Sequence, residues 1–90
     1  MFNMKSFNIQ LSSIIAVKEF VNIVNKCSYD IDLSSSRYVV DAKSIMGIFS
    51  LDLSKTIKVD VHSDDCDDLI NELKPYIVDW IRTEIKILKL

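Results

Sequence analysis

Apolar and polar residues alternate strictly in two stretches of the chain. Residues 6–11 read Ser-Phe-Asn-Ile-Gln-Leu, and in residues 55–61 the apolar positions are Ile57, Val59 and Val61. A period of two places alternate side chains on opposite faces of a β-strand. The pattern therefore predicts a strand in each stretch, with one buried face and one polar face.

Two further strands are predicted in the middle of the chain. Residues 30–33 place Ile31 and Leu33 on one face, and residues 37–40 do the same with Tyr38 and Val40. The serines at 34–36 lie between them and predict a turn. No glycine or asparagine marks that turn, so the sequence leaves its type open.

Helical spacing of apolar residues predicts two helices before the last strand. Ser12 and Ser13 offer an N-cap for the first, which is expected to end near Cys27 or Ser28. A short second helix is predicted to start at Ser44.

A third helix is predicted after the last strand. Its start, residues 63–68, is rich in aspartate, which the helix dipole favours at that end. An apolar stripe at helical spacing then continues to Leu88. Pro75 interrupts the stripe because proline lacks an N–H and clashes with the preceding turn, so a kink or break is expected near Lys74.

The predicted order is β-α-β-β-α-β-α. This order indicates an α+β domain in which three helices cover one face of a four-stranded antiparallel sheet. Ninety residues are enough for one hydrophobic core, so residues 1–90 are expected to form a single domain. Its end, at about 78–90, is expected to be a helical extension.

Charge and composition exclude several classes of function. The net charge is −2 without a basic patch, which disfavours nucleic-acid binding. The apolar runs are too short to span a bilayer, so no stable membrane insertion is expected. The first residues lack the apolar core of a signal peptide, which predicts a cytoplasmic protein.

The residues that bind metals are few and scattered. Cys27 and Cys66 are far apart in sequence, and His62 is the only histidine. They predict neither a disulfide framework nor a zinc site, and the cysteines are expected to pack as small hydrophobic residues. The aspartates at 64–68 lack the glycine and the distal glutamate of a calcium-binding loop. We expect no metal and no cofactor.

The segment 43–51, Lys-Ser-Ile-Met-Gly-Ile-Phe-Ser-Leu, is unusually apolar. Its large side chains are those of Ile45, Met46, Ile48 and Phe49. They cannot all point inward from one short helix. One part of the segment is therefore expected to pack, and the other part to be exposed to a partner.

The element order, together with Lys-Ser-Ile-Met-Gly at 43–47, resembles the HPr family, the phosphocarrier proteins of the bacterial phosphotransferase system. The resemblance extends from about Phe7 to Ile77. It implies the family's open-faced sandwich fold.

The resemblance also implies a regulatory site. In Gram-positive members the matching stretch holds a serine that HPr kinase/phosphorylase phosphorylates, which corresponds to Ser44 here. The family's apolar surface at this place docks Enzyme I, the kinase and a transcriptional regulator. The resemblance therefore implies a partner-binding surface made of Ile45, Met46, Ile48 and Phe49. Some relatives lack the family's histidine, keep the serine and regulate carbon catabolism.

The phosphotransfer site of the family is altered in this sequence. The family accepts phosphate on a histidine at the start of the first helix, near an arginine. The ungapped match puts Ser13 at the histidine, Ile15 at the arginine and Ala16 at the following proline. A serine hydroxyl lacks the basicity of an imidazole poised near neutral pH. We therefore expect no catalytic residue, and a regulatory or interaction role through Ser44.

Two alternatives stay open at this point. The chain could be a genuine phosphocarrier that uses Ser13 or His62 in place of the missing histidine. It could also be a structural remnant that forms a homodimer through the apolar residues of 78–90.

Overall fold

The computed structural model describes residues 5–63 and 65–80. Along the chain it contains β1 (Lys5–Ile9), α1 (Ile14–Val24), β2 (Ile31–Ser35), β3 (Tyr38–Asp41), α2 (Ile45–Phe49), β4 (Ile57–Val61), α3 (Asp67–Leu73), the 3-10 helix η1 (Lys74–Tyr76) and β5 (Ile77–Trp80). Every strand and helix expected before Pro75 is present. The predicted α+β class is therefore confirmed.

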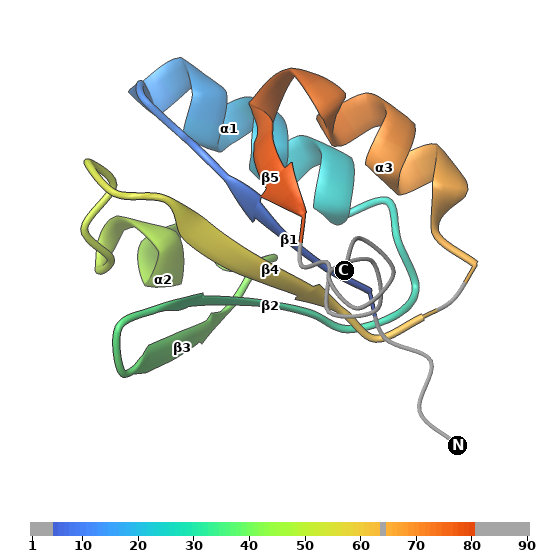
Figure 1. Cartoon of the computed structure of the whole chain (residues 1–90), viewed down its shortest axis with the longest axis horizontal. Coiled ribbons are helices and arrows are strands. Elements are labelled where there is room, and N and C mark those ends of the chain that lie inside the picture. The colour runs from blue at the N-terminus through green and yellow to red at the C-terminus, as the bar shows by residue number, and fades with distance from the viewer. Residues whose placement is uncertain (1–4, 64, 81–90) are drawn as a thin grey trace, which may run out of the picture.

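The strands form one antiparallel sheet in the order β3-β2-β4-β1-β5. In its centre Phe7 of β1 lies opposite Val59 of β4, and Leu33 of β2 lies opposite the same valine on the other side. α1 and α3 lie side by side along the sheet (Figure 1). The alternation of the sequence thus sets the register, since these apolar residues share one face.

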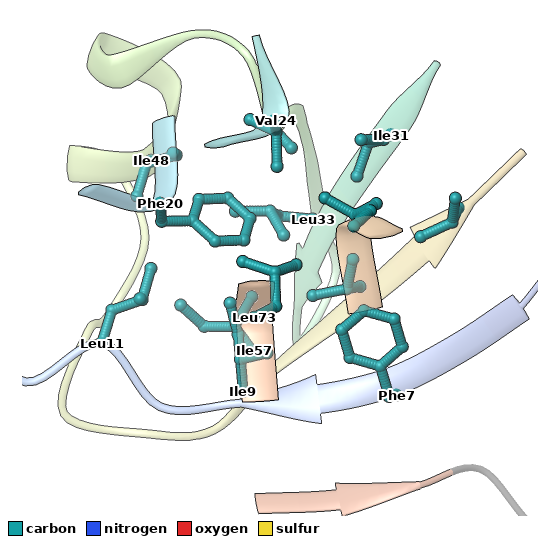
Figure 2. Packing of buried hydrophobic residues seen from close by; sticks show 14 of the residues in the cluster. Phe7, Ile9, Leu11, Phe20, Val24, Ile31, Leu33, Ile48, Ile57 and Leu73 are labelled. Carbon is teal, nitrogen blue, oxygen red and sulfur yellow. The ribbon is translucent and has the colours of Figure 1, made fainter. Parts of the chain in front are cut away.

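The hydrophobic core lies between that face and the helices. Figure 2 shows side chains from all three helices turned toward those of the strands; among them are Phe20, Ile48, Leu73, Ile9, Leu33 and Ile57. All of these side chains are buried. The opposite face of the sheet carries polar residues, for example Ser6, whose hydroxyl donates to Asp60 Oδ1 at 2.6 Å. The three helices therefore cover one face, as expected.

The sheet has a fifth strand, where four were expected. The helix predicted to continue through 78–80 is absent, because α3 ends at Leu73 and a short 3-10 helix that contains Pro75 follows from Lys74. Beyond it β5 pairs with β1, and the Gln10 N–H donates to the Tyr76 carbonyl at 2.9 Å. The β-branched pair Ile77-Val78 suits a strand. The rest of the predicted extension, residues 81–90, lies outside the described residues.

Two boundaries also differ from the sequence prediction. Ser34 and Ser35 belong to β2, so the hairpin loop is Ser36-Arg37. Ser36 has a positive φ of 55°, which is required at the first loop position of a type II′ turn and which glycine usually supplies. α1 ends at Val24, three or four residues earlier than expected, where a tighter turn begins with the Lys26 N–H donating to the Ile23 carbonyl at 3.2 Å.

Candidate functional site

Ser13 is the N-cap of α1. Its backbone is extended, and its hydroxyl oxygen accepts a hydrogen bond from the Ala16 N–H at 3.0 Å. This contact satisfies one of the N–H groups that the first turn of a helix leaves without a partner. The side chain of Ser13 is exposed. The predicted cap is therefore present at the position where the resemblance places the family's histidine.

A concave site lies between the start of α1 and the end of α2. It is lined by Gln10, Leu11, Ser12, Ser13, Ile14, Phe49, Leu53 and Ser54. None of these described lining residues is a lysine, an arginine or a histidine. A phosphoryl group on Ser13 would therefore have no cation in this site to balance its charge.

Ser44 is the N-cap of α2 and is exposed. Its hydroxyl oxygen accepts from the Gly47 N–H at 3.2 Å, and its carbonyl accepts from the Ile48 N–H at 3.1 Å. At the other end, the Ser50 hydroxyl donates to the Gly47 carbonyl at 2.5 Å. Serine side chains thus bond to the backbone at both ends of this helix of five residues.

The apolar side chains of α2 divide into two groups. Met46 is 77% exposed and Phe49 is 42% exposed, whereas Ile48 is fully buried and Ile45 is half-buried. Including Ile48 in the partner-binding surface was wrong, because its side chain fills the core and offers no area to a partner. Met46 and Phe49 are the exposed part of the segment.

Sequence reasoning missed Ile14 and Ile15 at the start of α1. Both side chains are mostly exposed, and Ile14 lines the same concave site as Phe49. The signal was present in the run of four apolar residues at 14–17, which a half-buried helix cannot place on one face. We call Ile14, Ile15, Met46 and Phe49 the apolar patch.

His62 lies at the other end of the sheet. β1 and β4 are antiparallel, so Ser13 follows the end where Ile9 pairs with Ile57, and His62 follows the end where Lys5 pairs with Val61. The His62 side chain is exposed, and its Nε2 lies 2.9 Å from Asp32 Oδ2. The structure therefore does not bring His62 and Ser13 into one site.

The two cysteines lie in a separate hollow between α1 and α3. Cys27 and Cys66 both line it and both are free thiols. Cys66 is buried, and this burial raises the pKa of its thiol above the ordinary value of 9.0. A raised pKa keeps the thiol protonated near neutral pH, which fits the prediction that it packs as a small hydrophobic residue.

Metal-binding and membrane-spanning features are not found in the described part of the chain. Among residues 5–63 and 65–80, no group of three or more histidine, cysteine, aspartate or glutamate side chains is arranged so that it could hold a metal ion. No helix in these ranges is long and apolar enough to cross a bilayer.

Fold and site together are those of a small α+β protein with two serine-capped helices beside an exposed apolar patch. A family model described as "PTS HPr component phosphorylation site" matches residues 15–78. The chain therefore belongs to the HPr family, the phosphocarrier proteins of the phosphotransferase system.

Two solved structures resemble the chain closely in fold. HPr-C-His from Thermoanaerobacter tengcongensis is 29% identical with a TM-score of 0.67, and the match covers 79% of this chain and 88% of that one. A phosphocarrier protein HPr from Bacillus anthracis str. Ames is 26% identical with a TM-score of 0.65, over 83% and 98% of the two chains. A search of curated proteins gave no match.

Proposed function

We propose that this chain is a regulatory member of the HPr family that acts by binding partner proteins and does not carry phosphate on a histidine. The observation that carries the proposal is the exposed apolar patch: its members Ile14 and Phe49 line the concave site together with Ser13, and no basic residue lines that site. An exposed group of large apolar side chains commonly marks a protein interaction surface.

Phosphotransfer at Ser13 is disfavoured by chemistry. The hydroxyl oxygen already accepts from the Ala16 N–H, and the position that the family fills with arginine holds Ile15. A phosphoserine ester is a poor onward donor compared with a phosphorylated imidazole. We infer that the start of α1 has become part of the binding surface.

Ser44 is proposed as the regulatory phosphorylation site, with HPr kinase/phosphorylase as the modifying enzyme. Its hydroxyl is exposed, and Met46 of the apolar patch follows two residues later. Phosphorylation would add roughly −1.5 to −2 charges there, together with oxygens that arginine side chains recognise. The modification would thus select partners with a cationic site, such as a transcriptional regulator, over partners that need the neutral surface, such as Enzyme I.

A second candidate function is phosphotransfer through His62. It is favoured by one observation, the 2.9 Å contact between His62 Nε2 and Asp32 Oδ2, because a carboxylate can orient an imidazole for reaction. The site is nevertheless at the opposite end of the sheet from the apolar patch. The homodimer expected through 78–90 stays a prediction, since most of that segment lies outside the described residues.

Incubation with phosphoenolpyruvate and Enzyme I tests the proposal. We expect no acid-labile phosphoryl group on the native chain by intact mass. The matched control is the double variant Ser13→His, Ile15→Arg, which restores the family's two residues and is expected to take up one phosphoryl group. Uptake by the native chain would contradict the proposal, and its loss in His62→Ala would assign the transfer to His62.

A further inference from the structure

The two edges of the sheet are different. β5 pairs with the outer side of β1 and so covers one edge of the sheet formed by the other four strands. β3, at the other edge, has a neighbour on one side only. In Figure 1 β3 lies at the margin of the sheet, with no strand beyond it. A bare edge strand presents backbone N–H and C=O groups to another strand.

The hairpin determines which backbone groups of β3 point outward. Its two-residue loop makes Ser35 and Tyr38 the closing pair, which exchanges hydrogen bonds in such hairpins. Hydrogen-bonded and non-hydrogen-bonded pairs alternate along an antiparallel ladder. Val39, opposite Ser34, is therefore a non-hydrogen-bonded residue, and its N–H and C=O point away from β2.

The side chains along this edge are exposed and complementary to themselves. Val39 is 67% exposed, and Tyr38 beside it is exposed to a similar extent. Arg37 and Asp41, two residues to either side of Val39, are also exposed. Among the described residues no ion pair involves Arg37. The edge thus carries a positive charge at one end, a negative charge at the other and apolar residues between.

We propose that β3 is a self-association edge, at which two copies of this chain pair β3 with β3 in antiparallel register across a twofold axis at Val39. In this register Val39 faces Val39 of the second copy, and Arg37 of each copy faces Asp41 of the other. Tyr38 lies opposite Val40, an aromatic and β-branched pair of the kind that stabilises sheets. The two sheets become one continuous sheet.

The register follows from two conditions. Only residues whose backbone groups point outward and are free can exchange hydrogen bonds; within β3 Val39 and Asp41 point outward, and the Asp41 carbonyl already accepts from the Ser44 N–H at 3.0 Å, which leaves Val39 as the central residue. Shifting the pairing by two residues toward Arg37 or toward Asp41 removes the opposition of unlike charges. The register centred on Val39 satisfies both conditions. Asp41 Oδ1 accepts from the Lys43 N–H at 2.9 Å, which leaves Oδ2 for the guanidinium group of the other copy.

The association is expected to be weak and reversible. A pair of short strands buries less than the roughly 1,200 Å² typical of stable complexes. The interface is also separate from the apolar patch, so a dimer built at β3 leaves Met46 and Phe49 accessible. The inference does not depend on the proposed function, and neither fails with the other.

Sedimentation equilibrium over a dilution series of the full chain tests the proposal. We expect a monomer–dimer equilibrium whose association constant falls at least about tenfold in Val39→Lys, because two lysines then face each other on the axis. Val78→Lys is the matched control, since Val78 is an exposed valine on the opposite edge strand. It is expected to leave the equilibrium unchanged. Arg37→Glu, in the exposed loop, provides a second weakening variant.

Amide signals of the native chain give an independent readout by NMR. As the protein concentration rises, the Val39 amide signal is expected to shift and its hydrogen to exchange more slowly with solvent. The amide signals of Tyr38 and Val40, whose N–H groups already bond to β2, are expected to change little. A chain that stays monomeric throughout would overturn the proposal. So would a dimer that Val78→Lys weakens as much as Val39→Lys, or one that Val39→Lys leaves intact.

Discussion

At the scale of single residues, Ser13 and Ser44 make the same contact. Each is the N-cap of a helix, and each accepts a hydrogen bond from the N–H three residues later, at 3.0 and 3.2 Å. Both caps were predictable from sequence, because a serine before an apolar helical run has this local bonding pattern as its favoured outcome. The two serines differ in their tertiary surroundings, which the local sequence does not determine.

Ser13→Ala tests the structural part of this account. Removing the hydroxyl should lower the free energy of unfolding by about 1 kcal/mol, since the Ala16 N–H loses its acceptor. Ser13→Asp, which keeps an acceptor, should retain most of that stability. Urea denaturation measures both. A Ser13→Ala variant as stable as the native chain would mean that the cap contributes nothing.

The raised pKa of the Cys66 thiol predicts that the free energy of unfolding depends on pH in the alkaline range. Burial raises the pKa of its thiol above 9.0, while Lys5 acts less strongly in the opposite direction. The folded state therefore holds this proton more tightly than the unfolded state. The associated stability is fully present below the unfolded pKa and is lost as the pH rises through the folded pKa.

The measurement is the free energy of unfolding between about pH 8 and pH 10. It should fall with pH in the native chain and fall less steeply in Cys66→Ala, even though that variant is less stable overall. Parallel curves for the two proteins would show that Cys66 is not the group responsible. Tyr76 also has a raised pKa, through its hydrogen bond to Glu19, and adds to the loss at the upper end of the range.

At the scale of elements, α2 separates buried from exposed apolar side chains within five residues. Ile48 is buried among the core side chains of α1 and the sheet, while Met46 projects from the surface. Sequence reasoning predicted that the segment would divide in this way. It could not decide which side chains face inward, because a helix of about one turn is too short for a period to be measured.

Two substitutions in α2 should therefore affect different properties: one should lower stability, and the other should weaken partner binding. Ile48→Ala should cost about 2–5 kcal/mol of stability through the cavity it leaves. Met46→Glu should change stability by less than about 0.5 kcal/mol, because the side chain is exposed, and should weaken binding of a partner such as Enzyme I. Chemical denaturation and a binding titration measure the two quantities. Unchanged binding by Met46→Glu would remove Met46 from the docking surface.

The strands were predictable for a different reason. In β1 and β4 the alternation has only one interpretation, and the register of Phe7 against Val59 follows from burying one face. β5 was missed because the apolar residues after Leu73 also fit helical spacing, and pairing with β1 is a tertiary contact that local sequence does not report. The position of the hairpin loop was misassigned because a serine, and not a glycine, has the positive φ at Ser36.

At the scale of the whole molecule, each part of the fold has a distinct role. The core holds the sheet and helices together, the start of α1 and the exposed side of α2 present the apolar patch, and β3 leaves one edge of the sheet bare. Family membership accounts for this architecture. Ser13 lies where the resemblance places the family's histidine, so the proposed function concentrates on Ser44.

Intact mass after incubation with HPr kinase/phosphorylase and ATP tests the regulatory role of Ser44 most directly. We predict a gain of one phosphoryl group in the native chain and in Ser13→Ala, and no gain in Ser44→Ala. The Ser13 variant is the matched control because it removes the other exposed N-cap hydroxyl. An unchanged mass of the native chain would contradict the proposal and leave Ser44 as a helix cap alone.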